Sequence, residues 1–476
     1  MPALLISLVV GCSVKTHNRA PPTDDTSAQR RHEDIRVFRE NFLAMDRAFT
    51  PATIAAAEQR LSRLENMSAS IRPSEFAVEL CRIAALADNA HTQCLPNWLG
   101  RDICQGVAAL GVNQPPWCQL KEPDSEIPDF STIPISLYPF GEEFHVVGAE
   151  ERNSDLLGAR LVAVEGHSIE RIRPTLRAFS GGTPAHRDER AAQVLVSPEQ
   201  LYVVGLSSSE DSVRYTFLTP DGRRIERILI LPKPSTKSAA WRSIPDGASA
   251  GWAFQAPDEP FRYRDAPEID SIVVQLRQHL DGHDQSITDF LDIAERQRVL
   301  LGRKNVVLDM RFNRGGNFLL TRDFINRWPK RVPGRFWVLT SRSTFSAAIA
   351  TIAYLKQAAP DRVTLIGEPV GDRLMFFSDG LPIQLPHSGL FFLPSTVRMD
   401  YRDGCRKYDD CSEAVAQPGR PTATSALPFL GELERLPLSI STLEPDIPVP
   451  WTIDSWLTGE DPMMEAVITL VEQDAQ

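Results

Sequence analysis

Four short apolar runs recur in the C-terminal half of the chain, and they constrain the fold more than any other feature. They read IDSIVVQL, NVVLDM, RFWVLT and VTLIGE, and all lie between residues 269 and 368. The segments that separate them have the apolar spacing of helices, as in SITDFLDIAERQRVLL and SAAIATIAYLKQAA. This alternation predicts an α/β domain in which helices cover a parallel sheet.

Two of the expected strand-to-helix turns carry chemically useful groups. In DMRFNRGGN, Gly315 and Gly316 precede a helix, where unshielded backbone amides suit an anion or a developing oxyanion. In TSRSTFSAAIA, Ser346 begins a helix whose first turn is rich in alanine, so its hydroxyl is not crowded. Taken singly, the glycines are explained by a tight turn and the serine by a helix N-cap.

Taken together, the two turns predict a reactive site. Parallel strands end at the same edge of a sheet, which is where open α/β folds build their sites. Ser346 is then a nucleophile beside the amides of the two glycines, which form an oxyanion hole. Arg311 and Asn313, in the first turn, are expected to brace it.

The rest of the chain predicts further units. Residues 31–125 contain helical patterns and carry His91 in a loop after the last of them. Residues 126–235 are rich in strand-like runs, and LLGARLVAVEGHSI resembles the strand pair of a PDZ-like domain. Residues 236–267 are rich in proline, glycine and serine, which predicts a linker, and residues 268–476 form the α/β core.

Residues 1–30 predict a leader and a polar tether. The apolar run in MPALLISLVVGC is far too short to span a bilayer. The sequence VVGC resembles the bacterial lipobox, whose cysteine, here Cys12, becomes lipidated. We therefore expect a periplasmic or cell-envelope protein that contacts a membrane only through this lipid. A mis-assigned start codon is the alternative explanation of the apolar run.

The chain has seven cysteines, and six remain when Cys12 is set aside. An even number permits disulfides in an oxidising compartment. Cys104 with Cys118 and Cys405 with Cys411 are plausible bridges, although sequence alone does not select the pairing. Free, buried cysteines in a cytosolic protein remain the alternative.

Several blocks of the sequence resemble the C-terminal-processing (tail-specific) serine protease family, which includes the core of the tricorn protease. They are NVVLDMRFNRGGN, FSAAIATIAYLKQAAPDRVTLIGEPVGDR and STLEPDIPV, and LADNAHTQ resembles the N-terminal D-G-H-T block of the family. The resemblance covers roughly residues 269–449. It implies a multidomain α+β and α/β chain with an N-terminal helical segment, a PDZ-like domain and a crotonase-like (ClpP/crotonase) catalytic domain.

The resemblance also assigns roles to residues. It implies that Ser346 is the nucleophile and that the amides of Gly316 and Ala347 form the oxyanion hole. The processing-protease branch has a lysine base shortly after GEP, but Arg373 stands there, and arginine stays protonated in proteins. His91 resembles the histidine base of the tricorn-like branch, and imidazole titrates near neutrality.

The group that orients His91 is left open at this stage. Tricorn-like enzymes have a glutamate shortly before the P-D-I block. In this chain Ser439 falls nearest that place, with Glu434 and Glu444 close by.

The function expected from these features is an exported serine endopeptidase that cleaves protein or peptide substrates through an acyl-enzyme on Ser346. The alternative is a catalytically inactive relative that binds peptide or lipid. A third hypothesis is an esterase that uses Ser249 in GASAG, which matches the G-x-S-x-G pattern without a strand before it or a helix after it.

Other classes of function are disfavoured. The net charge of -11 argues against a nucleic-acid partner, which needs a basic face. His279 and His283 have the spacing of a helical metal pair, but Gly282 interrupts the helix and no third ligand is evident. We therefore expect no metal and no cofactor.

Overall fold

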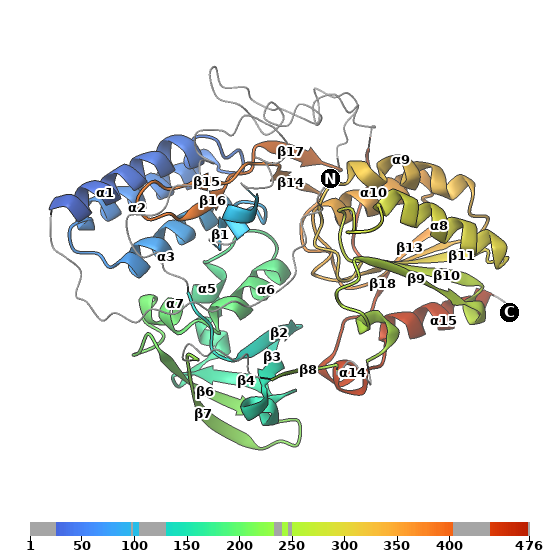
Figure 1. Cartoon of the computed structure of the whole chain (residues 1–476), viewed down its shortest axis with the longest axis horizontal. Helices are drawn as coiled ribbons and strands as arrows, with labels where there is room; N and C mark the ends of the chain where they lie inside the picture. Colours follow the sequence, from blue (N-terminus) through green and yellow to red (C-terminus); the bar gives the residue numbers. More distant parts are fainter. Residues whose placement is uncertain are drawn as a thin grey trace.

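The computed structural model describes residues 25–96, 99–103, 130–232, 240–245, 250–402 and 438–474. They form three bodies in Figure 1. The described residues between 25 and 103 make the N-terminal domain, those between 130 and 245 the middle domain, and those between 250 and 474 most of the C-terminal domain.

The C-terminal domain is built on a six-stranded sheet with the order β18-β13-β12-β11-β10-β9. All neighbouring pairs are parallel except β9 with β10. Its strands are β9 (Phe261–Ala266), β10 (Ser271–Leu276), β11 (Asn305–Asp309), β12 (Phe336–Thr340), β13 (Val363–Gly367) and β18 (Ile447–Pro448). Its helices are η5 (Trp252–Phe254), η6 (Pro267–Ile269), α8 (Ile287–Leu300), α9 (Leu319–Arg327), η7 (Trp328–Lys330), α10 (Ala347–Ala358), α14 (Ile453–Thr458) and α15 (Pro462–Asp474).

Both faces of this sheet are buried. Along β11, Val306 and Leu308 face the core that includes side chains of α8, α9 and α10, whereas Val307 faces a second core with side chains of α14 and α15. Strands covered on both faces need nearly continuous apolar runs, which is the pattern that the sequence shows. The predicted parallel α/β sheet is confirmed.

The middle domain has a sheet with the order β2-β3-β4-β6-β7, to which β5 and β8 add at β4 and β3. Its elements are β2 (Ile135–Phe140), β3 (Glu143–Glu150), η4 (Glu151–Leu156), β4 (Arg160–Val164), β5 (His167–Ser168), α5 (Ile169–Arg177), α6 (Pro184–Val194), α7 (Pro198–Val203), β6 (Ser212–Leu218), β7 (Arg224–Ile230) and β8 (Trp241–Ser243). A hairpin joins β6 and β7, and Gly222 has a φ of 83° in its turn.

The stretch 236–267, expected to be a linker, contains two strands. Within it, β8 pairs with β3 of the middle domain and β9 pairs with β10 of the C-terminal sheet. The prolines and glycines of this stretch favour turns. Short segments between them can still pair with the backbone groups that the edge strands of the neighbouring sheets leave exposed. These two strands were not anticipated within the predicted linker.

The N-terminal domain consists of helices completed by strands from far along the chain. Its own elements are α1 (Asp25–Val37), η1 (Phe38–Leu43), α2 (Pro51–Met67), α3 (Pro73–Ala84), η2 (Ala85–Ala87) and β1 (Gln93–Leu95). In the middle of a three-stranded sheet, β16 (Phe391–Leu393) pairs with β1 and with β15 (Ile383–Gln384). Figure 1 shows these orange strands beside the blue helices, so the expected core 268–476 also completes the N-terminal domain.

A separate two-stranded ribbon lies between the N-terminal domain and the C-terminal domain. It consists of β14 (Met375–Ser378) and β17 (Val397–Asp400), which pair antiparallel. Figure 1 shows the ribbon between the N-terminal helices and the helices α9 and α10 of the C-terminal domain.

One disulfide is present in the described part of the chain, and it joins Cys81 to Cys94. This pairing was not among the expected ones. The cysteines of the two expected bridges and Cys12 lie outside the described residues, as do Ser249 and Glu434. Across the described ranges, no helix combines the length and apolar character needed to cross a membrane, and no cluster of three or more metal-ligating side chains is found.

Candidate active site

Ser346 lies in the turn between β12 and α10. Its backbone has a φ of 56° and a ψ of -120°, a conformation that costs a residue with a Cβ about 1–3 kcal/mol. Its side chain does not cap α10 and accepts no hydrogen bond from the described residues. The N-cap explanation therefore does not account for this serine. The turn holds a partly exposed hydroxyl at the positive end of a buried helix.

Gly315 and Gly316 pass directly beside this serine, with φ values of 100° and 134°. A Cβ on Gly315 would lie 2.5 Å from the Cβ of Ser346, and one on Gly316 would lie 2.4 Å from the carbonyl oxygen of His279. Both positions therefore need glycine because of close approach. In the part of the chain that the structure describes, the N–H groups of Gly316 and Ala347 donate to no acceptor.

Asn313 ties the two turns together. Its Oδ1 accepts the N–H of Gly315 at 3.0 Å, so the amide of Gly315 is already engaged. Its Nδ2 donates to the carbonyl of Leu276 at 3.0 Å, and its own carbonyl accepts the N–H of Phe345 at 2.9 Å. The expected bracing role of Asn313 agrees with these contacts, which leave Gly316 as the glycine with an open amide.

His279 supports the glycine turn from behind. Its N–H donates to the carbonyl of Gly315 at 2.7 Å, and its carbonyl accepts the N–H of Asn317 at 2.7 Å. The imidazole is buried. Its Nδ1 lies 3.1 Å from Oδ1 of Asn313, and its Nε2 lies 2.7 Å from the Thr351 hydroxyl. Burial lowers the pKa of His279 to about 4, so the ring is neutral at pH 7.

Arg311 braces the same turn with a buried ion-pair cluster. Its guanidinium donates to both carboxylate oxygens of Asp309 and also to Asp461 on the segment before α15. Although burial opposes ionisation, the Arg311 guanidinium holds the pKa of Asp309 below its usual value. The end of β11 is thereby joined to the C-terminal helices.

His91 reaches this region from the loop that follows η2. Its side chain is almost completely buried, and Nδ1 lies 3.2 Å from Oδ2 of Asp372. The other carboxylate oxygen of Asp372 accepts the N–H of Arg373 at 2.8 Å. An anionic group at Nδ1 favours the tautomer with a proton on Nδ1, which leaves the lone pair on Nε2.

The imidazole of His91 is sandwiched between two aromatic rings. Its centroid lies 4.3 Å from that of Phe345 and 4.8 Å from that of Phe376, with the rings nearly parallel. Neither ring nitrogen makes a hydrogen bond to a described residue. Ser346 directly follows Phe345, and no hydrogen bond joins its hydroxyl to the imidazole.

Polar contacts hold the His91 loop to the ribbon of β14 and β17 and to the segment before β17. The Asn89 side chain bonds both backbone groups of Phe377 at 3.0 Å and the Ser395 hydroxyl at 3.0 Å. Thr92 donates to Asp46 at 2.7 Å, and Ser395 N–H donates to the same carboxylate at 2.8 Å. Burial raises the pKa of Asp46 to about 6.

Helix α6 of the middle domain contacts both turns. Glu189 accepts from Arg314, next to the glycine pair, and from the Ser343 hydroxyl at 3.3 Å. The His186 ring also stacks on Phe345, with a centroid distance of 5.2 Å. Burial lowers the pKa of His186 to about 3, so it stays neutral above pH 4. All three domains therefore meet around Ser346.

The orienting candidates expected from the sequence lie elsewhere. Ser439 donates to the carbonyl of Arg402 at 3.1 Å, and Glu444 is exposed. Within the described ranges neither contacts His91, and Glu434 falls outside them. Asp372 was not among the orienting groups expected from the sequence, although it directly precedes Arg373, which stands where the family has its lysine base.

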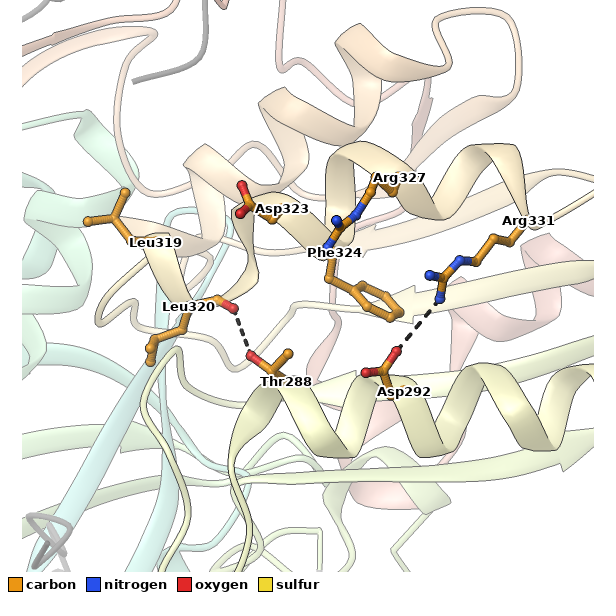
Figure 2. Close-up of a pocket in the computed structure, with 8 residues that line it drawn as sticks. All are labelled: Thr288, Asp292, Leu319, Leu320, Asp323, Phe324, Arg327 and Arg331. Carbon is orange, nitrogen blue, oxygen red and sulfur yellow. Dashed lines mark hydrogen bonds and ion pairs between the residues drawn. The ribbon is translucent and has the colours of Figure 1, made fainter. Parts of the chain in front are cut away.

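A pocket lies apart from these residues, between α8 and α9 (Figure 2). In it, Asp292 pairs with Arg331 at 3.6 Å, and Thr288 donates to the carbonyl of Leu320. None of the site residues described above lines it. We therefore place the candidate active site at Ser346 and not in this pocket.

Solved structures resemble the chain over nearly its whole length. A serine-to-alanine mutant of CPAF has a TM-score of 0.55 at 12% identity, covering 94% of this chain and 98% of its own. The fold resembles that of CPAF. Mature CPAF complexed with lactacystin has a TM-score of 0.51 at 12% identity, covering 94% and 98%. The photosystem II D1 C-terminal processing protease has a TM-score of 0.39 at 13% identity, covering 95% and 99%.

At this identity the likeness to CPAF shows the fold alone, which is a multidomain α/β fold resembling serine proteases such as CPAF. No protein-family model and no curated protein sequence matches the chain.

Proposed function

We propose that this protein is an exported serine endopeptidase that cleaves protein substrates through an acyl-enzyme on Ser346. The observation that carries the proposal is the strained backbone of Ser346 beside the open amides of Gly316 and Ala347. In this proposal the middle domain is PDZ-like and the C-terminal domain is a crotonase-like catalytic core. The fold resemblance to CPAF supports it.

The geometry suits acyl transfer. The Ser346 Oγ attacks the scissile carbonyl while Nε2 of His91 accepts its proton, and Asp372 stabilises the resulting imidazolium. The negative charge on the carbonyl oxygen is bound by the N–H groups of Gly316 and Ala347. The imidazolium then protonates the leaving amine as the C–N bond breaks. A water molecule, deprotonated by His91, hydrolyses the acyl-enzyme and regenerates Ser346.

The hydrogen bond between His91 and Ser346 must form when substrate binds. Catalytic hydrogen bonds are often long or absent without substrate and tighten in the Michaelis complex. A polypeptide that enters between α6 and the Ser346 turn would displace the Phe345 ring from the imidazole. The PDZ-like middle domain would present such a substrate as an added strand.

Labelling with a serine-reactive fluorophosphonate, read by mass spectrometry, tests the proposal. We expect an adduct on Ser346 that is absent in Ser346→Ala and strongly reduced in His91→Ala. The matched control is Ser249→Ala, which we expect to label like wild type. An adduct on Ser249 that disappears in this control would favour the esterase hypothesis and overturn the proposal. Hydrolysis of an unstructured protein substrate by the same variants separates peptidase from esterase activity.

A catalytically inactive, ligand-binding protein is the second candidate. The stacking of the buried His91 on two phenylalanines, without a hydrogen bond to the Ser346 hydroxyl, favours it. Under this alternative neither fluorophosphonate nor lactacystin, which CPAF binds, would modify wild-type protein. Peptide binding would then be unaffected by Ser346→Ala.

Export and lipidation are part of the proposal. The Cys81–Cys94 disulfide supports an oxidising compartment such as the periplasm or cell envelope. An intact mass of protein extracted from membranes tests lipidation at Cys12. A mass without acylation would exclude the lipid anchor and leave the peptidase proposal intact.

A further inference from the structure

Arg373 stands where the processing proteases have a lysine base, and the proposed mechanism gives it no chemical step. We propose that Arg373 is a positioning residue, which fixes the loop that carries His91 to the C-terminal and middle domains. The catalytic part of this inference rests on the proposed function. The structural part, that Arg373 holds the loop, does not.

The contacts of Arg373 are directed at the start of that loop. Its Nη1 donates to the carbonyl of Asp88 at 2.7 Å, and its Nη2 lies 3.1 Å from both carboxylate oxygens of Asp88. One guanidinium therefore binds the main chain and the side chain of the same residue. Asp88 has a φ of 49°, so the contact holds the residue where the chain leaves η2 in a left-handed turn.

The middle domain completes this contact. Arg187 on α6 donates to Asp88 as well, so two arginines from different domains share one carboxylate. Both arginines also donate to the carbonyl of Gly182, at 3.1 and 3.2 Å. Although burial opposes ionisation, the two guanidinium groups hold the pKa of Asp88 below its usual value. Asp88, Arg187, Arg373 and Gly182 form what we call the three-domain node.

The node is packed against the loop itself. A Cβ on Gly182 would lie 2.7 Å from the Cβ of Ala90, and one on Gly181 would lie 2.4 Å from the backbone nitrogen of Asn89. The glycine turn of the middle domain therefore lies directly on the residues that precede His91.

Two consecutive residues hold both ends of the loop segment. Asp372 lies at Nδ1 of His91, while Arg373 holds Asp88, three positions before the histidine. Because the two side chains share one backbone, the distance between Asp372 and His91 depends on the distance between Arg373 and Asp88. Losing the guanidinium would release the loop and let the imidazole move away from the carboxylate.

Losing the Arg373 guanidinium should loosen the His91 loop and leave the global stability of the protein nearly unchanged. The side chains of Arg373 and Asp88 are 44% and 53% exposed, and ion pairs at such positions contribute little to global stability. We therefore expect a change in loop protection and in kcat with little change in unfolding. Lysine has a single ammonium group, whereas arginine has a planar guanidinium that can make several hydrogen bonds. Arg373→Lys should therefore keep only part of the loop protection and of kcat.

The test compares wild type with Arg373→Gln and Arg373→Lys. The matched control is Arg223→Gln, which removes an arginine that pairs with Asp221 in the β6–β7 turn. Backbone hydrogen exchange of residues 85–93 and steady-state peptide hydrolysis are measured on each protein. For Arg373→Gln we expect at least tenfold faster exchange in this segment, a kcat at least tenfold lower, and a KM within twofold of wild type. Arg373→Lys should fall between, and the control should match wild type.

Two outcomes would contradict the inference. Unchanged exchange in residues 85–93 would overturn it whether or not the protein is active. A large rise in KM with unchanged kcat would mean that Arg373 binds substrate instead. If wild type hydrolyses nothing, the proposed function fails, but the exchange comparison still supports or refutes the positioning role.

A double-mutant cycle gives a second criterion. Asp88→Asn combined with Arg373→Gln should accelerate exchange by less than the sum of the two single changes, because both remove the ion pair between these side chains. Fully additive effects would contradict a shared node.

Discussion

The Nδ1 atom of His91 lies 3.2 Å from Oδ2 of Asp372. The carboxylate is almost fully buried and is held by the backbone N–H of Arg373. The two atoms do not form a hydrogen bond in this structure. In the proposed reaction the carboxylate orients the imidazole from the nitrogen that does not face the nucleophile. Asp372 lies on the loop after β13, whereas the orienting candidates left open by the sequence, Ser439, Glu434 and Glu444, all precede β18.

Replacing this carboxylate should lower kcat. Asp372→Asn presents an amide to Nδ1, which disfavours the required tautomer and removes the charge that stabilises imidazolium. We expect kcat to fall by about 10²–10⁴-fold with a smaller change in KM. Steady-state hydrolysis of a peptide measures both values. Asp361→Asn, an exposed aspartate after α10, is the control, and equal losses in the two variants would exclude the orienting role.

Gly315 should not tolerate a side chain. A Cβ there would lie 2.5 Å from the Cβ of Ser346, and the φ of 100° is unfavourable for alanine. We expect Gly315→Ala to abolish fluorophosphonate labelling and to lower the free energy of unfolding by about 1–3 kcal/mol. The control is Gly302→Ala, where φ is also positive but nothing lies within 4 Å of the new Cβ. Normal labelling of Gly315→Ala would argue against the close packing of the two turns.

The Cys81–Cys94 disulfide should stabilise the loop that carries His91, because the loop lies within the 13-residue separation of the two cysteines. Closing a loop of this size contributes about 3 kcal/mol. We expect the double variant Cys81→Ala/Cys94→Ala to unfold at lower denaturant concentration and to have lower kcat. Dithiothreitol should affect wild type in the same way and add little in the double variant. An unchanged kcat in both cases would mean that packing alone holds the loop.

The stability of the protein should depend on pH through His279. Its folded-state pKa of about 4 lies below the ordinary value of about 6.5, so the folded state binds fewer protons between these values. Its contribution is therefore complete above pH 6.5 and is lost as the pH falls toward 4, a change of about 3 kcal/mol.

Comparison with His279→Gln isolates this contribution. The difference in unfolding free energy between wild type and the variant should be about 2.5 kcal/mol smaller at pH 4.5 than at pH 7.5. Asp46 and His186 titrate in both proteins and cancel in the difference. Urea unfolding at the two pH values measures it, and a pH-independent difference would show that His279 is not held neutral by burial.

Local patterns were sufficient for much of the C-terminal domain. Runs such as NVVLDM and RFWVLT predict strands that are covered on both faces, and the sheet has them as β11 and β12. The glycine pair and Ser346 were identified because each lies where a strand passes into a helix. These features are determined by residues a few positions away in the sequence, so a local sequence pattern can predict them.

Contacts between distant segments were harder to predict. The pairing of β1 with β16 and the bridge between Cys81 and Cys94 depend on the tertiary fold, which brings these segments together. The even number of remaining cysteines allowed this bridge but did not select it. The strands inside the expected linker were missed because their partners are sheet edges that only the folded domains present.

The sequence by itself determined the α/β alternation, the strand-to-helix turns at Gly315–Gly316 and Ser346, and the presence of a loop histidine at His91. Those properties follow from hydrophobic periodicity and local backbone geometry. Only the tertiary structure decided that Asp372 stands at His91, and that Arg373 binds Asp88 from 285 positions away. Such contacts have no local signature, because burial of both sheet faces and docking of three domains bring the residues together.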